Sequence, residues 1–239
     1  FLRILRFLRF SIIYSNNLNY KYLNLCKKFK KKLLLLSFER RISEIKKIII
    51  HKNFENNSKI NKLSSFIEIS LECSVDFENF LRLCKFERKI NDVSFERRIK
   101  FLLRHNNVSK IKFIKKIDKF FRRRLQNNFQ IKKFSINNLY HLYLKKTDKD
   151  LTDLIIFGYA DKKLTKTRTL YFLNFLKKIE NKKFPLNGKD LMKIGFVSNK
   201  LIGTVIEKVN MWWFSKNLLP QKRECLLYAK RFLPTSTGR

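Results

Sequence analysis

Arginines near the N-terminus are the first residues of this chain whose type and spacing suggest binding chemistry. Arg3, Arg6 and Arg9 recur at every third position of FLRILRFLRFSIIY, residues 1–14. In a helix this spacing keeps the three guanidinium groups near one face, while Leu, Ile and Phe fill the others. The segment therefore predicts an amphipathic helix with one cationic stripe, which is either simply solvated or bound to an anion.

Three acidic residues in the segment TDKDLTD could hold a metal ion: Asp148, Asp150 and Asp153. Paired aspartates bind Mg²⁺ in many phosphoryl-transfer sites. For nucleotidyl transfer, however, the pair needs a rigid strand behind a Gly-rich turn, and this segment has neither. Acidic residues also favour the first turn of a helix. We therefore expect a helix start here and no metal site.

Histidine and cysteine show no catalytic or metal-binding spacing. The histidines are isolated, without a paired Ser, Cys or carboxylate: His51, His105 and His141. The cysteines form no CxxC motif: Cys26, Cys73, Cys84 and Cys225. We expect the histidines to be structural or exposed and the cysteines to be reduced, buried thiols.

The charge of the chain points to a polyanionic partner. Lys and Arg number 55 against 19 Asp and Glu, a formal net charge of +36. Such a surface attracts nucleic acid through its long-range field and through counterion release. An anionic membrane surface is the alternative, and codon drift in an AT-rich genome also enriches Lys, Asn, Ile and Phe.

The composition favours helices packed around a hydrophobic core. Apolar residues make up 44% of the 239 residues, and Gly and Pro together number only eight, 5 and 3. Few breakers and many apolar residues indicate packed, all-helical structure. No stretch reaches the roughly 18 uninterrupted apolar residues that a membrane span needs.

Glycine, proline and tryptophan concentrate in residues 184–213, FPLNGKDLMKIGFVSNKLIGTVIEKVNMWW. The pattern predicts a short helix over 190–194 and a longer one over 202–214. Three of the five glycines are expected to shape the two turns of this stretch: Gly188, Gly195 and Gly203. Asp190 is expected to cap a helix start rather than to bind a metal.

Helical periodicity and capping residues predict the other elements. Expected helices cover 37–50, 64–83, 94–103, 109–127, 137–146, 151–160 and 162–183. The hexapeptide SFERRI occurs at Ser37 and again at Ser94. We interpret it as chance or as two similarly capped helices. The basic segment 16–32 is either a solvated helix face or a phosphate-contacting patch.

The N-terminal segment resembles a helix of the class II tRNA nucleotidyltransferases (CCA-adding enzymes) and the related bacterial poly(A) polymerases. In that family a Glu-Asp-x-x-Arg motif reads the incoming ATP or CTP. The resemblance implies that Arg3 is the motif arginine and that the two acidic residues would precede Phe1. The downstream pattern Glu-Arg-x-x-x-Glu is matched by Glu39, Arg40 and Glu44. These residues, with Arg6, are implied to support the nucleotide helix, through buried ion pairs.

The stretch 184–213 is similar to a C-terminal pattern of the same family. The matching residues are Pro185, Gly188, Asp190, Leu191, Met192, Gly195, Ile202, Gly203 and Trp212. Asn199 and Lys200 stand where the family usually has Gly and Pro. Because Asn tolerates left-handed backbone, we expect the turn to be retained.

The two resemblances imply an all-α, elongated helical array. Its parts would be a neck (1–60), a body (61–145) and an RNA-binding tail (146–239), with the catalytic head preceding Phe1. The implied activity adds CCA or A to the 3′ ends of tRNA or other RNA, with ATP and CTP as substrates and Mg²⁺ bound by the head. This chain alone is expected to bind RNA and to contain no catalytic or metal-binding residue.

Two other classes of protein remain open at this point. One is a non-catalytic, basic, helical RNA-binding protein, and the other is a membrane-surface protein whose N-terminal helix inserts its Phe and Leu face. CCA addition and poly(A) addition share this scaffold, so the sequence does not choose between them. Bacterial cytoplasm is the expected location, with an organelle as the alternative.

Overall fold

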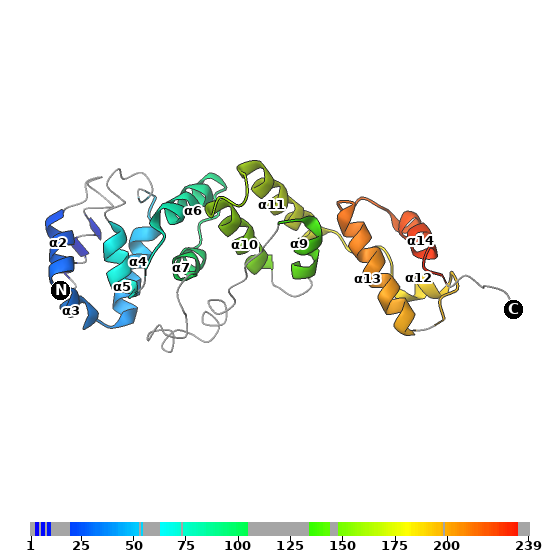
Figure 1. Cartoon of the computed structure of the whole chain (residues 1–239), viewed down its shortest axis with the longest axis horizontal. Helices are drawn as coiled ribbons and strands as arrows, with labels where there is room; N and C mark the ends of the chain where they lie inside the picture. Colours follow the sequence, from blue (N-terminus) through cyan, green and yellow to red (C-terminus); the bar gives the residue numbers. More distant parts are fainter. Residues whose placement is uncertain are drawn as a thin grey trace. The chain divides into compact units, whose positions relative to one another are not determined.

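A computed structural model describes the chain except residues 1, 2, 5, 8, 11–19, 53, 55–62, 73, 105–133, 144–147, 198 and 234–239. The predicted helix 109–127 lies outside the described residues. Those that are described form helices and connections without any strand (Figure 1), which confirms the all-α class. The finer arrangement into neck, body and tail stays a prediction.

The chain divides into two compact units. The first comprises residues 1–129 and 156–163, and the second comprises residues 130–155 and 164–239. The labelled helices are α2 (Tyr20–Lys28), α3 (Lys30–Leu34), α4 (Phe38–Ile49), α5 (Ser64–Leu71), α6 (Phe77–Lys89), α7 (Phe95–Leu103), α9 (Ile136–Tyr143), α10 (Asp148–Ala160), α11 (Lys166–Asn181), α12 (Gly188–Met192), α13 (Asn199–Ser215) and α14 (Lys222–Lys230).

The two SFERRI hexapeptides begin helices α4 and α7 with the same cap. The Ser37 hydroxyl accepts a hydrogen bond from the Arg40 backbone N–H at 3.4 Å, and Ser94 accepts one from Arg97 at 3.3 Å. Each hydroxyl satisfies one of the backbone donors left open at a helix start. The interpretation as two similarly capped helices is therefore confirmed.

The predicted single helix over residues 64–83 is wrong, because the chain forms two helices there. Helix α5 ends at Leu71, and the residue that follows it, Glu72, has a left-handed φ of 56°. Helix α6 then starts after Asp76, whose carboxylate accepts a hydrogen bond from the Asn79 backbone N–H at 3.2 Å. The left-handed residue ends the helix without a glycine, so no breaker in the sequence marks the end of α5.

Aromatic rings link the helices of the first unit. Phe80 on α6 contacts Phe54 and Phe101, with ring centroids 6.0 and 6.5 Å apart. Phe101 in turn meets Phe157 edge-on at 5.1 Å. All four rings are buried, and such pairs add to the burial of apolar area. This core fixes α6 and α7 against the end of α10.

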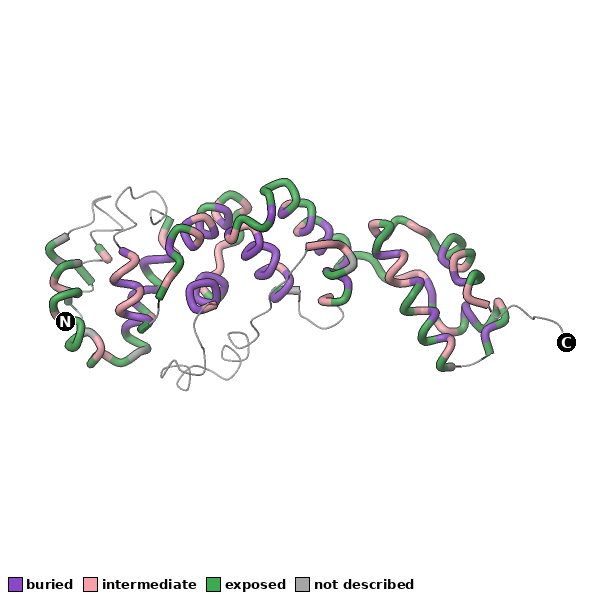
Figure 2. The backbone as a smooth tube through the Cα atoms, in the orientation of Figure 1, coloured by how far each residue is buried: buried purple, intermediate pink, exposed green. Residues whose placement is uncertain are grey.

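A buried ion cluster lies between α6 and α7. Glu87 accepts hydrogen bonds from Arg97 at 2.9 Å and from Arg98 at 2.6 Å. Arg98 also donates to the backbone carbonyls of Ile49 and Cys84. Figure 2 shows α7 buried along most of its length. Arg97 and Arg98 are among its buried residues. Burial raises the pKa of the Glu87 carboxyl, and the two guanidinium groups only partly offset that effect.

Helix α13 is central to the second unit, where it packs against α9, α12 and α14. Helix α12 starts with a reciprocal cap in which Asn187 accepts from the Asp190 backbone N–H at 3.1 Å and Asp190 accepts from that of Asn187 at 3.0 Å. A salt bridge of 2.6 Å from Lys222 to Asp190 links this cap to α14. Asp190 is thus a helix-start residue, as predicted, and the Lys222 hydrogen bond holds its pKa below the usual range.

Two details of the stretch 184–213 differ from the prediction. Helix α13 begins at Asn199, so Asn199 and Lys200 are helical rather than part of a turn. Gly203 consequently lies inside α13, where a Cβ would meet no atom within 4 Å, and it shapes no turn. Gly195 does occupy a turn, with a φ of 107° that favours glycine. Helix α14 was not predicted.

Two cysteines lie in the described core as free, buried thiols, Cys84 and Cys225. Burial raises the pKa of the Cys225 thiol to about 11. The prediction of reduced, buried thiols is confirmed for these two residues. The side chains of Cys26 and Cys73 lie outside the description.

Breaking the ion cluster is predicted to destabilise the first unit strongly. Glu87→Leu removes the carboxylate that two buried guanidinium groups share; Arg97 keeps its salt bridge to Asp92 at 3.0 Å, but Arg98 loses its carboxylate partner. We expect a loss of about 3–5 kcal/mol in the free energy of unfolding. Glu87→Leu combined with Arg98→Met should recover part of that loss. Urea unfolding followed by circular dichroism measures both. The control Glu78→Gln alters an exposed residue of α6 and should change the free energy by less than about 0.5 kcal/mol. Equal losses in the control and in Glu87→Leu would contradict the role of the cluster.

Asp190→Ala is predicted to lower the thermal midpoint by about 2–4 °C at pH 7. The lowered pKa of Asp190 means that its carboxylate stabilises the fold above the unfolded pKa, and that this stabilisation is lost as pH falls through the folded value. The difference from wild type should therefore shrink as the pH falls through the folded pKa of Asp190. Lys222→Gln removes the salt bridge but keeps the cap, so it should have a smaller effect. A difference that persists undiminished in acid would refute this account.

Candidate nucleotide- and RNA-binding groove

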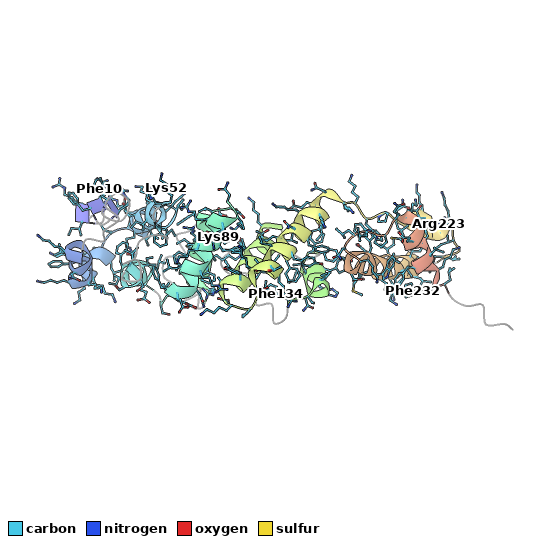
Figure 3. The ribbon with its side chains drawn as sticks, turned by 90° about the horizontal axis from the view of Figure 1, so that it is seen from above. Phe10, Lys52, Lys89, Phe134, Arg223 and Phe232 are labelled. Carbon is cyan, nitrogen blue, oxygen red and sulfur yellow. The ribbon has the colours of Figure 1, made fainter. Side chains whose placement is uncertain are left out.

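An open groove of about 1310 Å³ lies between the N-terminal helical segment (residues 3–10) and the end of α4. We call it the cationic groove. Its described lining residues are Arg3, Arg6, Phe7, Arg9, Phe10, Ser43, Lys46, Lys47, Ile50, His51 and Lys52. Figure 3 labels Phe10 and Lys52, one from each wall.

Spacing along the N-terminal segment brings its arginines to the groove. The described residues of this segment are helical, and Arg3, Arg6 and Arg9 follow one another at three-residue intervals. Arg3 and Arg6 are exposed, whereas Arg9 is half-buried. The predicted cationic stripe is therefore present on a helix and faces a groove.

The amphipathic pattern of α4 supplies the opposite wall. Ile45 and Ile48 turn into the core, which leaves Lys46 and Lys47 exposed on the outer face of the last turn. Cations at the carboxyl end of a helix interact favourably with its macrodipole. The connection that follows adds Lys52 to the same wall.

Glu44 lies under the groove and joins its two walls. The carboxylate is only 4% exposed and accepts from Arg9 at 2.9 Å and from Lys47 at 3.0 Å. Arg9 belongs to the N-terminal segment, whereas Glu44 and Lys47 belong to α4. The buried carboxylate therefore holds the segment against the helix and neutralises part of the charge of the two cations.

The remaining charge of the groove is positive. Six of the described lining residues are Arg or Lys, and no described lining residue is acidic. Cations gathered along a concave surface focus the field and raise the local concentration of anions. In complexes with nucleic acids, Arg and Lys side chains make many of their contacts with backbone phosphates.

Two aromatic side chains give the groove a second kind of contact. Phe7 and Phe10 are 48% and 58% exposed and lie three residues apart on the N-terminal segment. Exposed rings beside guanidinium groups form stacking platforms for unpaired bases. The groove thus combines cationic side chains with exposed aromatic rings.

The structure brings some of the predicted site residues together and leaves others apart. Arg3 and Arg6 line the groove, and Glu44 supports it through Arg9. Glu39 and Arg40 lie exposed in the first turn of α4, away from the described groove lining. The roles proposed for these residues in nucleotide recognition stay predictions.

The predicted tail residues belong to the second unit and do not line the cationic groove. Leu191 is fully buried and Met192 is half exposed. The Trp212 ring stacks on Tyr228, with ring centroids 4.4 Å apart. Pro185 lies half-buried in the turn before α12. These residues contribute packing and helix boundaries.

Sequence reasoning missed the α4 wall of the groove, Lys46, Lys47, His51 and Lys52. The sequence did not distinguish these lysines from others, because the chain has 55 Lys and Arg residues and many of them lie on the polar faces of amphipathic helices. Arg9 was visible through its spacing from Arg6, but its pairing with Glu44 was not.

Mg²⁺, which the family resemblance assigns to a catalytic head and not to the described residues, stays a prediction. No group of three or more His, Cys, Asp or Glu side chains that could hold a metal ion occurs among them. Asp150 and Asp153 are buried in the first turns of α10, where the sequence predicted a helix start. We therefore derive no chemical step through a metal from this chain.

Loss of the Glu44 carboxylate is predicted to loosen the N-terminal segment. Glu44→Gln breaks the charge pair with Arg9 and should cost about 1–2 kcal/mol of local stability. Tryptic cleavage after the arginines of the segment should then be roughly tenfold faster in native buffer, since about 1.4 kcal/mol is a factor of ten. Lys47→Gln is the matched control, because it removes the other partner of Glu44 and keeps Arg9. Equal cleavage rates in all three proteins would show that Glu44 does not hold the segment.

No family model matches the chain, and no curated protein matches its sequence. Within the part that the structure describes, no helix has the length and apolar character needed to cross a membrane.

Proposed function

We propose that this chain is the RNA-binding and nucleotide-recognition portion of a template-independent RNA nucleotidyltransferase. The intact activity would add CCA, or A, to the 3′ ends of tRNA or other RNA. The observation that carries the proposal is the cationic groove, in which Arg3 and Arg6 lie beside two exposed phenylalanines. The family resemblance of the two ends of the chain supplies the reaction.

Each part of the groove has a chemical task in this proposal. The Arg3 guanidinium offers a planar fork of donors to the acceptor atoms of an incoming ATP or CTP base. Phe7 and Phe10 stack on unpaired bases of the RNA end. Lys46, Lys47 and Lys52 contact phosphates, which position the strand without reading its sequence.

The metal-dependent step belongs to a catalytic head that the resemblance implies. Carboxylates of that head would hold the Mg²⁺ ions that stabilise the attacking and leaving oxygens in nucleotidyl transfer. The chain in hand would bind and position the RNA and select the nucleotide. By itself it should bind RNA and not extend it.

The proposal predicts separate outcomes for binding and for catalysis. The 239-residue chain should bind a fluorescent single-stranded RNA, and Arg3→Gln with Arg6→Gln should weaken that binding about tenfold, as expected from losing two charge-assisted contacts. Fluorescence anisotropy at fixed salt measures the affinity. Lys177→Gln with Lys178→Gln, on the exposed face of α11, changes the net charge equally and is the matched control.

Two results would contradict the proposal. Equal losses of affinity in the arginine variant and the control would show that the groove has no special role. Steady incorporation of α-³²P-labelled ATP or CTP into tRNA by this chain would refute the assignment of catalysis to a head. In an intact enzyme with the head, Arg3→Ala should reduce discrimination of ATP and CTP from GTP and UTP, and unchanged selectivity would remove Arg3 from nucleotide recognition.

A further inference from the structure

A second basic groove lies in the first unit, on helix α6. It encloses about 550 Å³, and its cations are Arg82, Lys85 and Lys89 from α6 and Lys162 from the turn after α10. The three α6 residues are three and four positions apart, so they share one face of the helix. We call this site the α6 groove.

Arg82 forms part of the wall of the α6 groove, and its contacts with Tyr159 hold its side chain in place. Arg82 donates from Nε to the Tyr159 backbone carbonyl at 3.0 Å, and its guanidinium lies 4.4 Å from the centre of the Tyr159 ring. The same ring contacts Phe86 at 4.4 Å between centroids. Because Arg82 and Phe86 already cover this ring, it offers little stacking surface to a base. The α6 groove therefore differs from the cationic groove, whose two rings are exposed.

The lysines of α6 carry charge that the described protein does not neutralise. Glu78 is the acidic residue among the described lining and pairs with Lys162 at 2.9 Å. Lys85 and Lys89 have no ion-pair partner among the residues that the structure describes. Like charges four residues apart on a helix repel each other, and a bound anion would offset this cost.

The spacing of the two lysines suits a chain of anions. A rise of about 1.5 Å per residue places Lys85 and Lys89 about 6 Å apart along the axis of α6. Each ammonium can therefore contact a different phosphate of one strand. Ammonium groups bind phosphate as point charges, without the planar geometry that would select a base.

We propose that the α6 groove binds the sugar-phosphate backbone of RNA, with Lys85 and Lys89 each contacting a phosphate and Arg82 and Lys162 forming the rest of the anion site. This inference rests on the proposed function for the identity of the ligand. It goes beyond that function by assigning a second contact that is independent of base sequence and separate from the cationic groove.

The test uses the salt dependence of RNA binding. Fluorescence anisotropy with a labelled RNA hairpin, from 50 to 200 mM KCl, gives the slope of log affinity against log salt concentration. Each lost phosphate contact lowers the magnitude of this slope by about 0.7–0.9. Lys85→Gln with Lys89→Gln should therefore lower it by roughly 1.5. The loss should be the same for a hairpin of scrambled sequence.

Matched variants separate charge at this site from charge in general. Lys177→Gln with Lys178→Gln has the same net charge and should lower the slope less. Lys85→Arg with Lys89→Arg should retain the wild-type slope. Thermal unfolding of the glutamine variant should match wild type, because both lysines are exposed.

The outcomes distinguish this inference from the proposed function. If Arg3→Gln with Arg6→Gln weakens RNA binding and the α6 variant has the slope of the α11 control, the α6 groove is not an RNA site and the proposed function stands. If the wild-type chain binds no RNA, both proposals fail. If the α6 variant loses binding to phosphatidylserine vesicles and keeps its RNA slope, a membrane surface is the ligand and the inference is overturned.

Discussion

The buried cluster of Glu87, Arg97 and Arg98 is the interaction on which the first unit depends. Three charged groups removed from water are costly unless each finds a partner. The guanidinium of Arg98 reaches Glu87 on α6 and also the last-turn carbonyl of Ile49 on α4. The requirement for full pairing therefore restricts how three helices can meet. The orientation of α4 also places Glu44 and the lysines of the cationic groove, so the cluster supports this groove indirectly.

The repeated hexapeptide performs the same two tasks in both copies. In each copy, the serine caps the start of its own helix. The second arginine donates a hydrogen bond to a backbone carbonyl near the end of a different helix. Arg41 donates to the carbonyl of Ser70 on α5 at 2.8 Å, as Arg98 does to that of Ile49 on α4. An orphan carbonyl at a helix end needs such a donor when it is shielded from water. Identical residues thus solve an identical packing problem at two places, which requires no solenoid repeat.

Local patterns predicted most of the helices but not the way in which charges are used. The serine caps and the apolar periodicity of α4 and α7 were sufficient, because both are encoded within a few residues. The end of α5 before Glu72 was not predicted, because no glycine marks it. The start of α13 at Asn199 was not predicted, because the family pattern has a turn at this position. Buried arginines such as Arg98 were unpredictable because an arginine on an amphipathic helix normally lies in solvent. The spacing of Arg3 and Arg6 in the sequence was sufficient to predict a cationic helix face. Which lysines line the same groove depends on how α4 packs, and only the fold shows it.

The position of Glu44 makes the cationic groove uneven along its length. One carboxylate oxygen faces Arg9 and the other faces Lys47, so both of these cations are partly screened where the two walls join. Arg3 and Arg6 lie on the preceding turns of the N-terminal segment, farther along the chain from this screening carboxylate. The potential therefore has a gradient from one end of the segment to the other. An anion entering the groove would be attracted most strongly beside Arg3 and Arg6, so a single buried acid sets which end of the groove is the more positive.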